Sequence, residues 1–288
     1  MINRLIIIAS ILLAIAFSTL LERKILGLSQ IRKGPALVGT EGLFQPFSDG
    51  LKLLSKVEII WSNSIVILLA PGVIFSLIMI FWFPQTSGMV YMNLAALYLL
   101  AVGSVMGLFV LVVGWSGGRS YSLIGGLRAA AQMISYEVVL SFFFILYCSV
   151  DWSLNLFALK SLSICLIAPF FYTFILWIVV LLAETNRAPF DISEGESELV
   201  RGFNTEYSRI LFTILFLMEY GVICAYGMLS SYFMLGGWRG GIIFISLILW
   251  LRSCFPRKRY DSLITLLWIY YFPLILIITL SWVLALIC

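Results

Sequence analysis

Residues 94–113 read LAALYLLAVGSVMGLFVLVV, twenty residues without a charged side chain. An α-helix rises about 1.5 Å per residue, so this stretch would extend over about 30 Å, the thickness of the hydrocarbon core of a bilayer. A run of this length and composition is typical of a transmembrane helix. The same criterion applies to the rest of the chain.

Seven further apolar runs are long enough for the same assignment. Pro71, Pro169 and Pro273 lie inside three of them, which membrane helices tolerate. The seventh span depends on Arg239 and Arg252, whose long side chains can reach the interface from its two ends. The eight predicted spans are Leu5–Leu21, Ile65–Phe83, Leu94–Val113, Ala129–Cys148, Leu162–Ala183, Ile210–Met228, Trp238–Phe255 and Ile264–Ile287.

The composition of the whole chain agrees with this assignment. Of its 288 residues, 62% are hydrophobic and 11% are charged, whereas soluble domains have about 45–50% and about 25%. So few charges could not cover the surface of a soluble protein of this size. The composition excludes a soluble globular protein, a disordered chain and a nucleic-acid binder. We expect an all-α integral membrane protein with a single membrane domain over residues 1–288.

Histidine is absent, and none of the five cysteines belongs to a Cys-x-x-Cys motif. Haem ligation by histidine, histidine-containing zinc sites and Ser-His or Cys-His catalysis are therefore excluded within this chain. Any redox metal must lie on another subunit.

The basic residues are distributed unevenly among the loops. Fifteen of the 18 Lys and Arg residues follow odd-numbered spans, and only Arg4, Lys160 and Arg239 lie on the other side. The positive-inside rule places the larger group on the inner side, so both termini are predicted to lie outside. The first span has no small-residue cleavage site before Glu22, so we interpret it as a retained helix and not as a signal peptide.

The first inner loop, residues 22–62, contains an amphipathic pattern. One helical stripe carries Leu43, Phe44, Phe47, Leu51 and Leu54, and polar residues lie opposite. This pattern predicts a helix of about 15 residues that lies in the membrane interface. Packing on a neighbouring protein would produce the same pattern.

Two carboxyl groups fall inside predicted spans. Glu137 follows Arg128 by nine residues, and Glu219 follows Ile210 by nine, which places both about 13 Å deep. Neither has a cation within one helical turn. An ionised carboxylate at that depth costs several kcal/mol or more unless it takes up a proton or finds water or a partner. The placement favours a proton relay, and a buried structural hydrogen bond is the alternative.

The inner loop over residues 184–209 is acidic. Five acids lie between Glu184 and Glu198, and Glu206 follows. Against Arg187, Arg201 and Arg209 they leave a net charge of −3. Closely spaced acids titrate together and can pass protons. Docking of a basic partner would explain the cluster equally well.

Several sequence blocks carry a resemblance to a known family. The blocks are ERKILGLSQIRKGP (22–35), GLFQPF (42–47), SYEV (135–138), ETNRAPFD (184–191), GESELV (195–200), GFN (202–204) and Pro256-Arg257 with Arg259-Tyr260-Asp261. Together they resemble the quinone-chamber membrane subunit of respiratory complex I, the NADH:ubiquinone oxidoreductase chain 1 family with its bacterial counterparts. Two stretches depart from the family pattern: Arg201, where a small residue is usual, and the loop Gly117-Gly118-Arg119.

The resemblance implies eight helices, a quinone entry channel and chamber wall, and coupling of quinone reduction to proton transfer through buried acids. The chain would be a non-redox subunit of proton-translocating NADH:ubiquinone reductase. Ubiquinone would be the substrate, with NADH, FMN and iron–sulfur clusters on partner subunits. The implied partners are the peripheral quinone-site and iron–sulfur subunits, other membrane-arm subunits and the lipid bilayer, with no nucleic acid and no metal in this chain.

The resemblance also assigns roles to single residues. The acids of the proton relay are Glu137, Glu184, Asp191, Glu194, Glu196, Glu198 and Glu219. The residues of the quinone channel and chamber are Arg23, Arg32, Asp49, Arg187, Phe203, Arg252 and Arg257.

Two other function classes stay open at this point. A standalone transporter or proton channel would also bury acids, but it gives no reason for the large charged inner surface. A related hydrogenase or electron-transfer subunit without a quinone site is the other. The absence of a presequence, the Phe/Ile-rich composition and the missing histidine favour the mitochondrial inner membrane, with both termini on the intermembrane-space side. The bacterial plasma membrane is the alternative.

Overall fold

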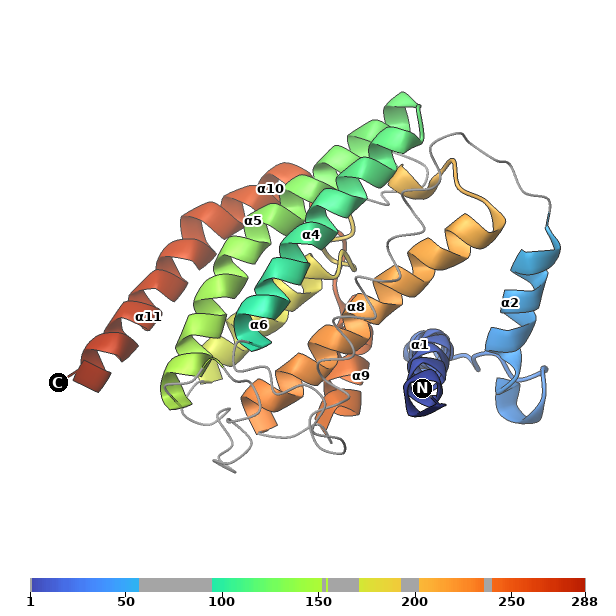
Figure 1. Ribbon diagram of the computed structural model, residues 1–288, viewed down its shortest axis with the longest axis horizontal. Helices are drawn as coiled ribbons and strands as arrows, with labels where there is room; N and C mark the ends of the chain where they lie inside the picture. The colour runs from blue at the N-terminus through green and yellow to red at the C-terminus, as the bar shows by residue number, and fades with distance from the viewer. Residues whose placement is uncertain are drawn as a thin grey trace.

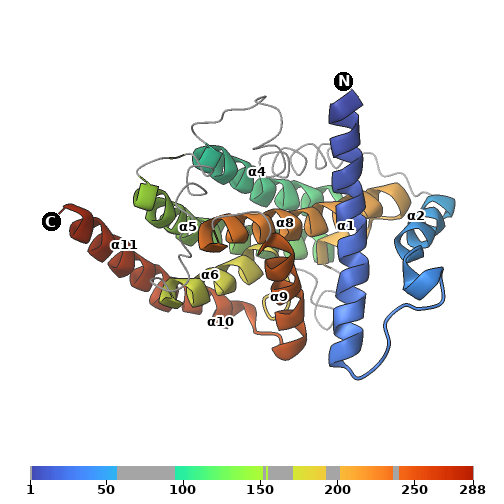
Figure 2. The same ribbon diagram turned by 90° about the horizontal axis from the view of Figure 1, so that it is seen from below.

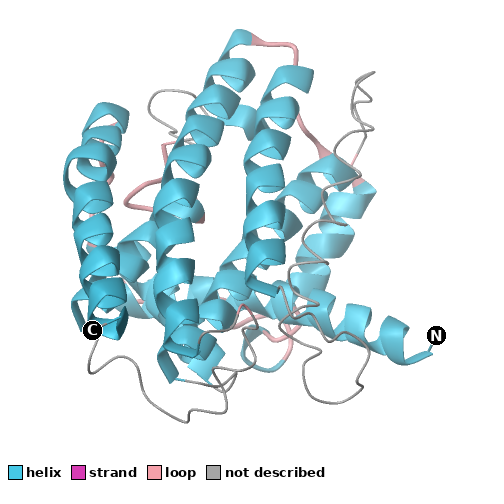
Figure 3. Ribbon diagram, turned by 60° about the vertical axis from the view of Figure 1, so that its left-hand side comes forward, coloured by secondary structure: helices cyan, strands magenta, loops and turns pink. Residues whose placement is uncertain are grey.

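The computed structural model describes residues 2–56, 95–151, 154, 171–192, 202–235 and 240–287. Within these ranges every regular element is helical and no strand occurs (Figure 3). The elements are α1 (Ile2–Ser29), η1 (Thr40–Gly42), α2 (Gln45–Ser55), α4 (Ala95–Ser116), α5 (Ser120–Asp151), α6 (Phe171–Glu184), η4 (Gly202–Asn204), α8 (Arg209–Leu235), α9 (Gly241–Cys254), α10 (Tyr260–Thr265), η6 (Leu266–Tyr271) and α11 (Phe272–Ile287). The all-α prediction is confirmed for these residues.

Four of the described segments are long and apolar enough to cross a membrane: Ala96–Ser116, Ser120–Val150, Leu211–Leu235 and Tyr260–Ala285. The helices α6 and α9 are apolar but shorter, with 14 residues each. The predicted span Ile65–Phe83 and the first part of Leu162–Ala183 lie outside the described residues. The count of eight spans therefore stays a prediction.

Several helices extend beyond the predicted spans. The helix α5 begins at Ser120, whereas the span was predicted from Ala129. Similarly, α8 continues to Leu235, beyond the predicted end at Met228. A search for apolar runs stops at charged or polar residues such as Arg128, whereas a helix continues through them because they do not interrupt its backbone hydrogen bonds.

The helices α4 and α5 form a hairpin in which they pack closely against each other. The helices α10 and α11 lie beside α5, on the side away from α4 (Figure 1). One close approach is between Gly114 on α4 and Gly126 on α5. A Cβ atom added at Gly114 would lie 2.7 Å from the Cα atom of Gly126. Small residues permit such close packing between membrane helices. Next to this contact, Gly125 meets Gly202 in the same manner, which holds η4 against α5.

An aromatic cluster fills the space between α5, α6 and α8. The Trp177 ring lies 5.4 Å from Phe143 and 5.3 Å from Phe233, both edge to face. Tyr147 stacks on Phe233 at 4.6 Å. The indole Nε1–H of Trp177 donates to Ser230 Oγ at 3.1 Å, so the buried polar group has a partner. This packing fixes α6 relative to α8, and both helices carry acids of the site.

The helices α1 and α2 lie at one side of the bundle, where α1 crosses α8 and α9 (Figure 2). The guanidinium of Arg23 on α1 pairs with Asp49 on α2 at 2.6 Å. The Phe17 and Phe47 rings meet edge to face at 6.3 Å. No residue of α2 is buried, and its apolar stripe is exposed. The chain is thus helical where the amphipathic helix was expected, and its position in the membrane interface stays a prediction.

The C-terminal span is interrupted by a π-helical segment, η6, between α10 and α11. Pro273 follows this segment closely. Proline cannot donate the usual backbone hydrogen bond, and its ring clashes with the carbonyl four residues earlier, so the preceding turn widens. On α11 the side chains of Leu274, Ile277, Leu280 and Leu284 are exposed, as expected of a surface that faces lipid or a partner.

Candidate functional site

The chain turns sharply at the C-terminal end of α6 and brings two charged residues toward α8. Backbone N–H groups of Thr185 and Arg187 donate to Leu181 and Leu182, and Asn186 takes a φ of 48°, a conformation that asparagine tolerates better than most residues. From α5, the Gln132 amide donates to the carbonyls of Ala183 and Phe190 at 2.7 and 3.0 Å. These bonds satisfy the end of α6 and fix Glu184 and Arg187 in place.

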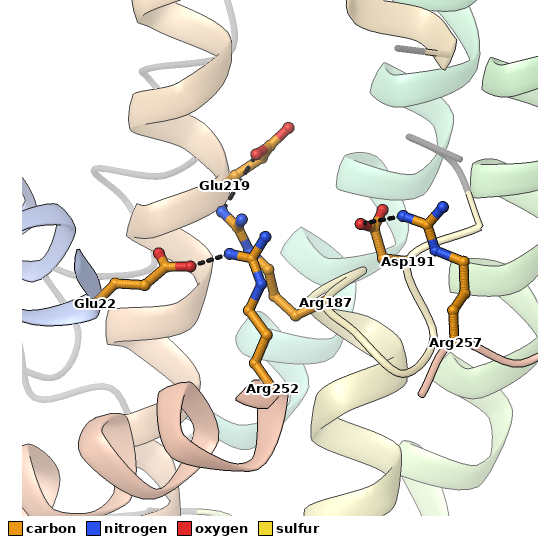
Figure 4. Close-up of polar contacts among 6 residues, drawn as sticks. All are labelled: Glu22, Arg187, Asp191, Glu219, Arg252 and Arg257. Carbon is orange, nitrogen blue, oxygen red and sulfur yellow. Dashed lines mark hydrogen bonds and ion pairs between the residues drawn. The ribbon is translucent and has the colours of Figure 1, made fainter. Parts of the chain in front are cut away.

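Glu219 on α8 has polar partners from two other elements. One carboxylate oxygen lies 3.3 Å from Arg187 Nη2, and the other accepts from Asn204 Nδ2 at 3.2 Å (Figure 4). The guanidinium of Arg187 also lies 4.6 Å above the Tyr220 ring. Both side chains of the ion pair are nearly buried, 7% and 14% exposed. Glu219 thus has a cation, although none lies within one helical turn in the sequence.

Glu184 is the most deeply buried acid of the site, with 2% of its surface exposed. Its Oε1 atom accepts a hydrogen bond from the Tyr226 hydroxyl at 3.4 Å. Its Oε2 atom is buried and has no hydrogen-bond partner among the described residues. Ionisation of a carboxyl group in this position costs free energy, because the charge is buried. Such a group is suited to take up and release a proton.

Glu184 and Glu219 line the same small cavity. Its volume is about 20 Å³, which is room for about one water molecule. Asn186 and Phe203 also line it, and so do apolar residues of α4, α5 and α8. The predicted chamber residue Phe203 is buried there, 3% exposed. The structure therefore brings two predicted relay acids and one predicted chamber residue to one small cavity.

Glu137, on α5, is the third predicted acid of this region. A Cβ atom added at Gly103 of α4 would lie 4.0 Å from Glu137 Oε1 and 3.8 Å from the Tyr226 hydroxyl. Glu137 and Tyr226 therefore face the same point over Gly103. Tyr226 thus contacts Glu184 and faces the same point as Glu137, and Glu184 and Glu219 line one cavity. We call the three predicted acids Glu137, Glu184 and Glu219 the row of acids.

Two further ion pairs surround this row (Figure 4). Arg257 Nη2 lies 2.9 Å from Asp191 Oδ2 and joins the loop before α10 to the loop after α6. Arg252 on α9 pairs with Glu22 on α1, whose side chain is 3% exposed. The predicted channel arginines at positions 187, 252 and 257 thus pair with an acid on α8, an acid on α1 and an acid in the loop after α6, respectively.

The remaining predicted residues lie apart from the row or outside the described residues. Arg23 and Asp49 pair with each other between α1 and α2. Arg32 lies in the exposed loop after α1, where it donates to Gln30, and the structure does not bring it to the acids. Glu194, Glu196 and Glu198 lie outside the described residues. No group of three or more acids or cysteines that could hold a metal ion occurs in the part of the chain that the structure describes.

The loop before α8 is tied to the end of α4. The Tyr207 hydroxyl donates to the carbonyl of Val113 at 2.7 Å and lies 2.5 Å from Ser116 Oγ. Burial raises the pKa of Tyr207, while the hydrogen bond with Ser116 lowers it and the neighbouring Glu206 raises it. Glu206 itself pairs with Arg119 at 3.2 Å. The unusual loop Gly117-Gly118-Arg119 thus supplies a cation to the acidic loop.

Sequence reasoning missed Glu22, Asn204, Gln132 and Tyr226. Of these, Tyr226 had a signal in the sequence, because it lies seven residues after Glu219 and therefore on the same face of α8 two turns away. The others act from elements that only the tertiary structure brings to the site.

Comparison with known proteins finds a matching family and relatives whose names agree with it. A family profile described as NADH dehydrogenase matches residues 2–283. The chain is 41% identical to NADH-ubiquinone oxidoreductase chain 1 of Metridium senile, over 94% of this chain and 88% of that protein. It is 41% identical to the protein of the same name from Papio hamadryas, over 95% and 92%. It is 40% identical to an NADH-quinone oxidoreductase subunit of Paramagnetospirillum magneticum, over 93% and 86%.

Proposed function

The chain belongs to the NADH dehydrogenase family, and on that premise we propose that it is the quinone-channel membrane subunit of a proton-translocating NADH:ubiquinone oxidoreductase, respiratory complex I. In this proposal the chain is not catalytic alone. Ubiquinone is the substrate, and NADH, FMN and the iron–sulfur clusters belong to partner subunits. The partners are the peripheral quinone-site and iron–sulfur subunits and the other membrane-arm subunits.

The single observation that carries the coupling role is the enclosed row of acids. Glu219 and Glu184 line one cavity with room for about one water molecule. Glu137 and the Tyr226 hydroxyl, which donates to Glu184, face the same point over Gly103. Ionisable groups inside a membrane domain are costly and mark proton pathways. We propose that protons pass along this row from the inner end of α8 into the bundle.

The quinone entry channel is proposed at the side of the bundle formed by α1, α2 and α8. The apolar stripe of α2 is exposed and suits contact with acyl chains and a prenyl tail. Beside it stand the pairs Arg23–Asp49 and Arg252–Glu22, at the inner ends of α1 and α9. Charged side chains next to an apolar wall suit a substrate with a polar ring and an apolar tail.

The proposed coupling starts at Arg187. Reduction of a quinone to a quinol takes up two electrons and two protons, and negative charge that develops near Arg187 competes with Glu219 for its guanidinium. Glu219, deprived of its cation, takes up a proton, because a bare carboxylate is unfavourable in a nearly buried position. The cavity then offers the proton a path to Glu184. Asp191, held by Arg257, is proposed as the entrance of this path. The resemblance assigns Glu194, Glu196 and Glu198 to the same relay.

The experiment is Glu219→Gln in the whole complex, in membranes, with assembly checked on a native gel. NADH-driven quinone reduction and proton pumping are expected to fall at least tenfold while the complex still assembles. Glu41→Gln is the matched control, because the Glu41 side chain is 90% exposed and lies outside the row. Retention of pumping near the wild-type level would remove Glu219 from the coupling path and leave its structural ion pair as its role.

The same gel separates the function classes. A complex subunit is expected to migrate with peripheral iron–sulfur and flavin proteins. Migration of the wild-type chain alone would favour a standalone transporter. A large complex that contains no quinone-reductase activity would favour a related hydrogenase-type assembly.

The distribution of Lys and Arg among the loops predicts how the chain is oriented in the membrane. We propose that the mitochondrial inner membrane holds the chain with both termini on the intermembrane-space side, because most Lys and Arg residues lie in loops on one side. Protease accessibility of a tag at either terminus in sealed mitoplasts, compared with a tag in the loop after α1, tests this orientation.

A further inference from the structure

We propose that the hydroxyl group of Tyr226 carries protons between Glu184 and Glu137; this inference rests on the proposed coupling function and adds a residue to its path. Tyr226 lies on α8, two turns after Glu219. Its side chain extends toward α6 and α5, the two helices that carry the other acids.

The first observation is the hydrogen bond to Glu184. The Tyr226 hydroxyl donates to Glu184 Oε1 at 3.4 Å. Among the described residues no hydrogen bond joins Glu184 to Glu137 directly. Any proton that moves between these two acids therefore needs a group between them that can both accept and donate, and a phenol hydroxyl does both.

The second observation is the space over Gly103. A Cβ atom added at Gly103 would lie 3.8 Å from the Tyr226 hydroxyl and 4.0 Å from Glu137 Oε1. Gly103 has no side chain, so nothing from this position of α4 fills the point that both polar groups face. Four helices contribute to this arrangement: α4 gives the space, and α5, α6 and α8 give Glu137, Glu184 and Tyr226.

The proton balance of the proposed step is simple. The hydroxyl gives its proton to the ionised Glu184 carboxylate and takes the proton of the protonated Glu137 carboxyl across the space over Gly103, and the reverse direction exchanges the two roles. One O–H bond breaks as another forms on the same oxygen. Tyrosine is neutral before and after the step, so no phenolate has to persist inside the membrane domain. The net result is one proton moved from one carboxyl group to the other.

The arrangement also gives a reason for tyrosine at this position. Phenylalanine would pack in the same space, but Glu184 Oε1 would lose its hydrogen bond from the hydroxyl. The other oxygen, Oε2, has no hydrogen-bond partner among the described residues even with tyrosine present. The aromatic ring alone therefore does not explain the contact. The hydroxyl is the part of Tyr226 that reaches the row of acids.

The test uses Tyr226→Phe in the assembled complex in sealed membranes. Quinone reduction without a proton gradient, protons pumped per electron, and the solvent deuterium isotope effect on pumping are measured. We expect assembly to persist and protons pumped per electron to fall at least threefold. An unchanged ratio with an unchanged isotope effect would overturn the proposal.

A second pair of variants tests the space over Gly103 without touching Tyr226. Gly103→Ala would place a methyl group between the hydroxyl and Glu137, at ordinary contact distances. Gly107→Ala is its matched control, one turn along α4, where the methyl group would meet only Ile134 and Met133 at 3.6 Å. Pumping is expected to fall with the first and to stay unchanged with the second. Equal pumping in both would contradict a proton path over Gly103.

Glu184→Gln separates this inference from the function on which it rests. Loss of pumping in Glu184→Gln together with normal pumping in Tyr226→Phe would leave the acid relay intact and exclude the tyrosine. Normal pumping in both variants would contradict the relay itself.

Discussion

Arg187 and Glu219 lie 32 residues apart in the sequence and meet across 3.3 Å inside the helix bundle. The arginine comes from the turn after α6 and the glutamate from the middle of α8. Both side chains are nearly buried, where a charge is costly to desolvate, and each contributes the opposite charge to the other. The pair therefore links the stability of the site to its protonation state.

The first prediction follows from this pair. Arg187→Met is expected to destabilise the complex strongly, by about 3–5 kcal/mol, because it removes the cation that lies 3.3 Å from the nearly buried Glu219 carboxylate. Thermal inactivation of the detergent-solubilised complex and its yield on a native gel measure the effect. Arg23→Met is the comparison, since the Arg23–Asp49 pair is 50% and 34% exposed and such pairs contribute about 0–1 kcal/mol. Equal losses in the two variants would contradict the prediction.

The second prediction concerns Tyr207 and its pH dependence. Tyr207→Phe removes the hydrogen bonds to Val113 and Ser116 and is expected to lower the stability of the complex by about 1–3 kcal/mol. The folded protein has the raised pKa, so this contribution is fully present below the ordinary tyrosine pKa of about 10 and is lost as the pH rises through the raised value.

Thermal inactivation of wild type and Tyr207→Phe from about pH 7 to about pH 11 checks both parts. The two curves are expected to lie apart up to about pH 10 and to converge above it. Tyr121→Phe is the control, because the Tyr121 side chain is exposed. A gap that widens as the pH rises would show that the sign is wrong.

The third prediction concerns the exposed stripe of α2. Leu51→Lys places a charge on the apolar face, whereas Ser48→Lys places the same charge on the polar face of the same helix. If the stripe lies in the interface beside the entry channel, Leu51→Lys raises the KM for a long-tailed quinone several-fold and leaves kcat nearly unchanged. A short-tailed quinone is less affected. The same KM for both lysine variants would place this face away from the quinone path.

The sequence predicts the helical, membrane-embedded character of the chain because that character depends on composition and run length alone. Leu94–Val113 was expected as a span, and α4 covers nearly the same residues. The predicted spans were shorter than α5 at its start and shorter than α8 at its end, because polar residues interrupt an apolar run but not a helix.

The partners of the buried acids could not be predicted in the same way. A search along α8 finds no cation near Glu219, because Arg187 reaches it from another element. Glu184 was expected at the start of a loop, and the structure has it as the buried last residue of α6. Contacts of this kind depend on how the turn after α6 folds back, and local sequence patterns do not encode that turn. Tyr226 is the exception, since its spacing from Glu219 was readable.

The last prediction concerns the contact between α4 and α5, on which the row of acids depends. Gly114→Val is expected to prevent assembly, because its Cβ atom would lie 2.7 Å from the Cα atom of Gly126 and backbone cannot give way as a flexible side chain does. Gly50→Ala is expected to stabilise the protein instead. Nothing lies within 4 Å of that Cβ position on α2, and alanine stabilises a helix interior by about 0.5–1 kcal/mol relative to glycine. Native gels and thermal inactivation measure both variants. Normal assembly of Gly114→Val would mean that α4 and α5 pack farther apart than described, and the cavity between Glu184 and Glu219 would then lose its wall from α4.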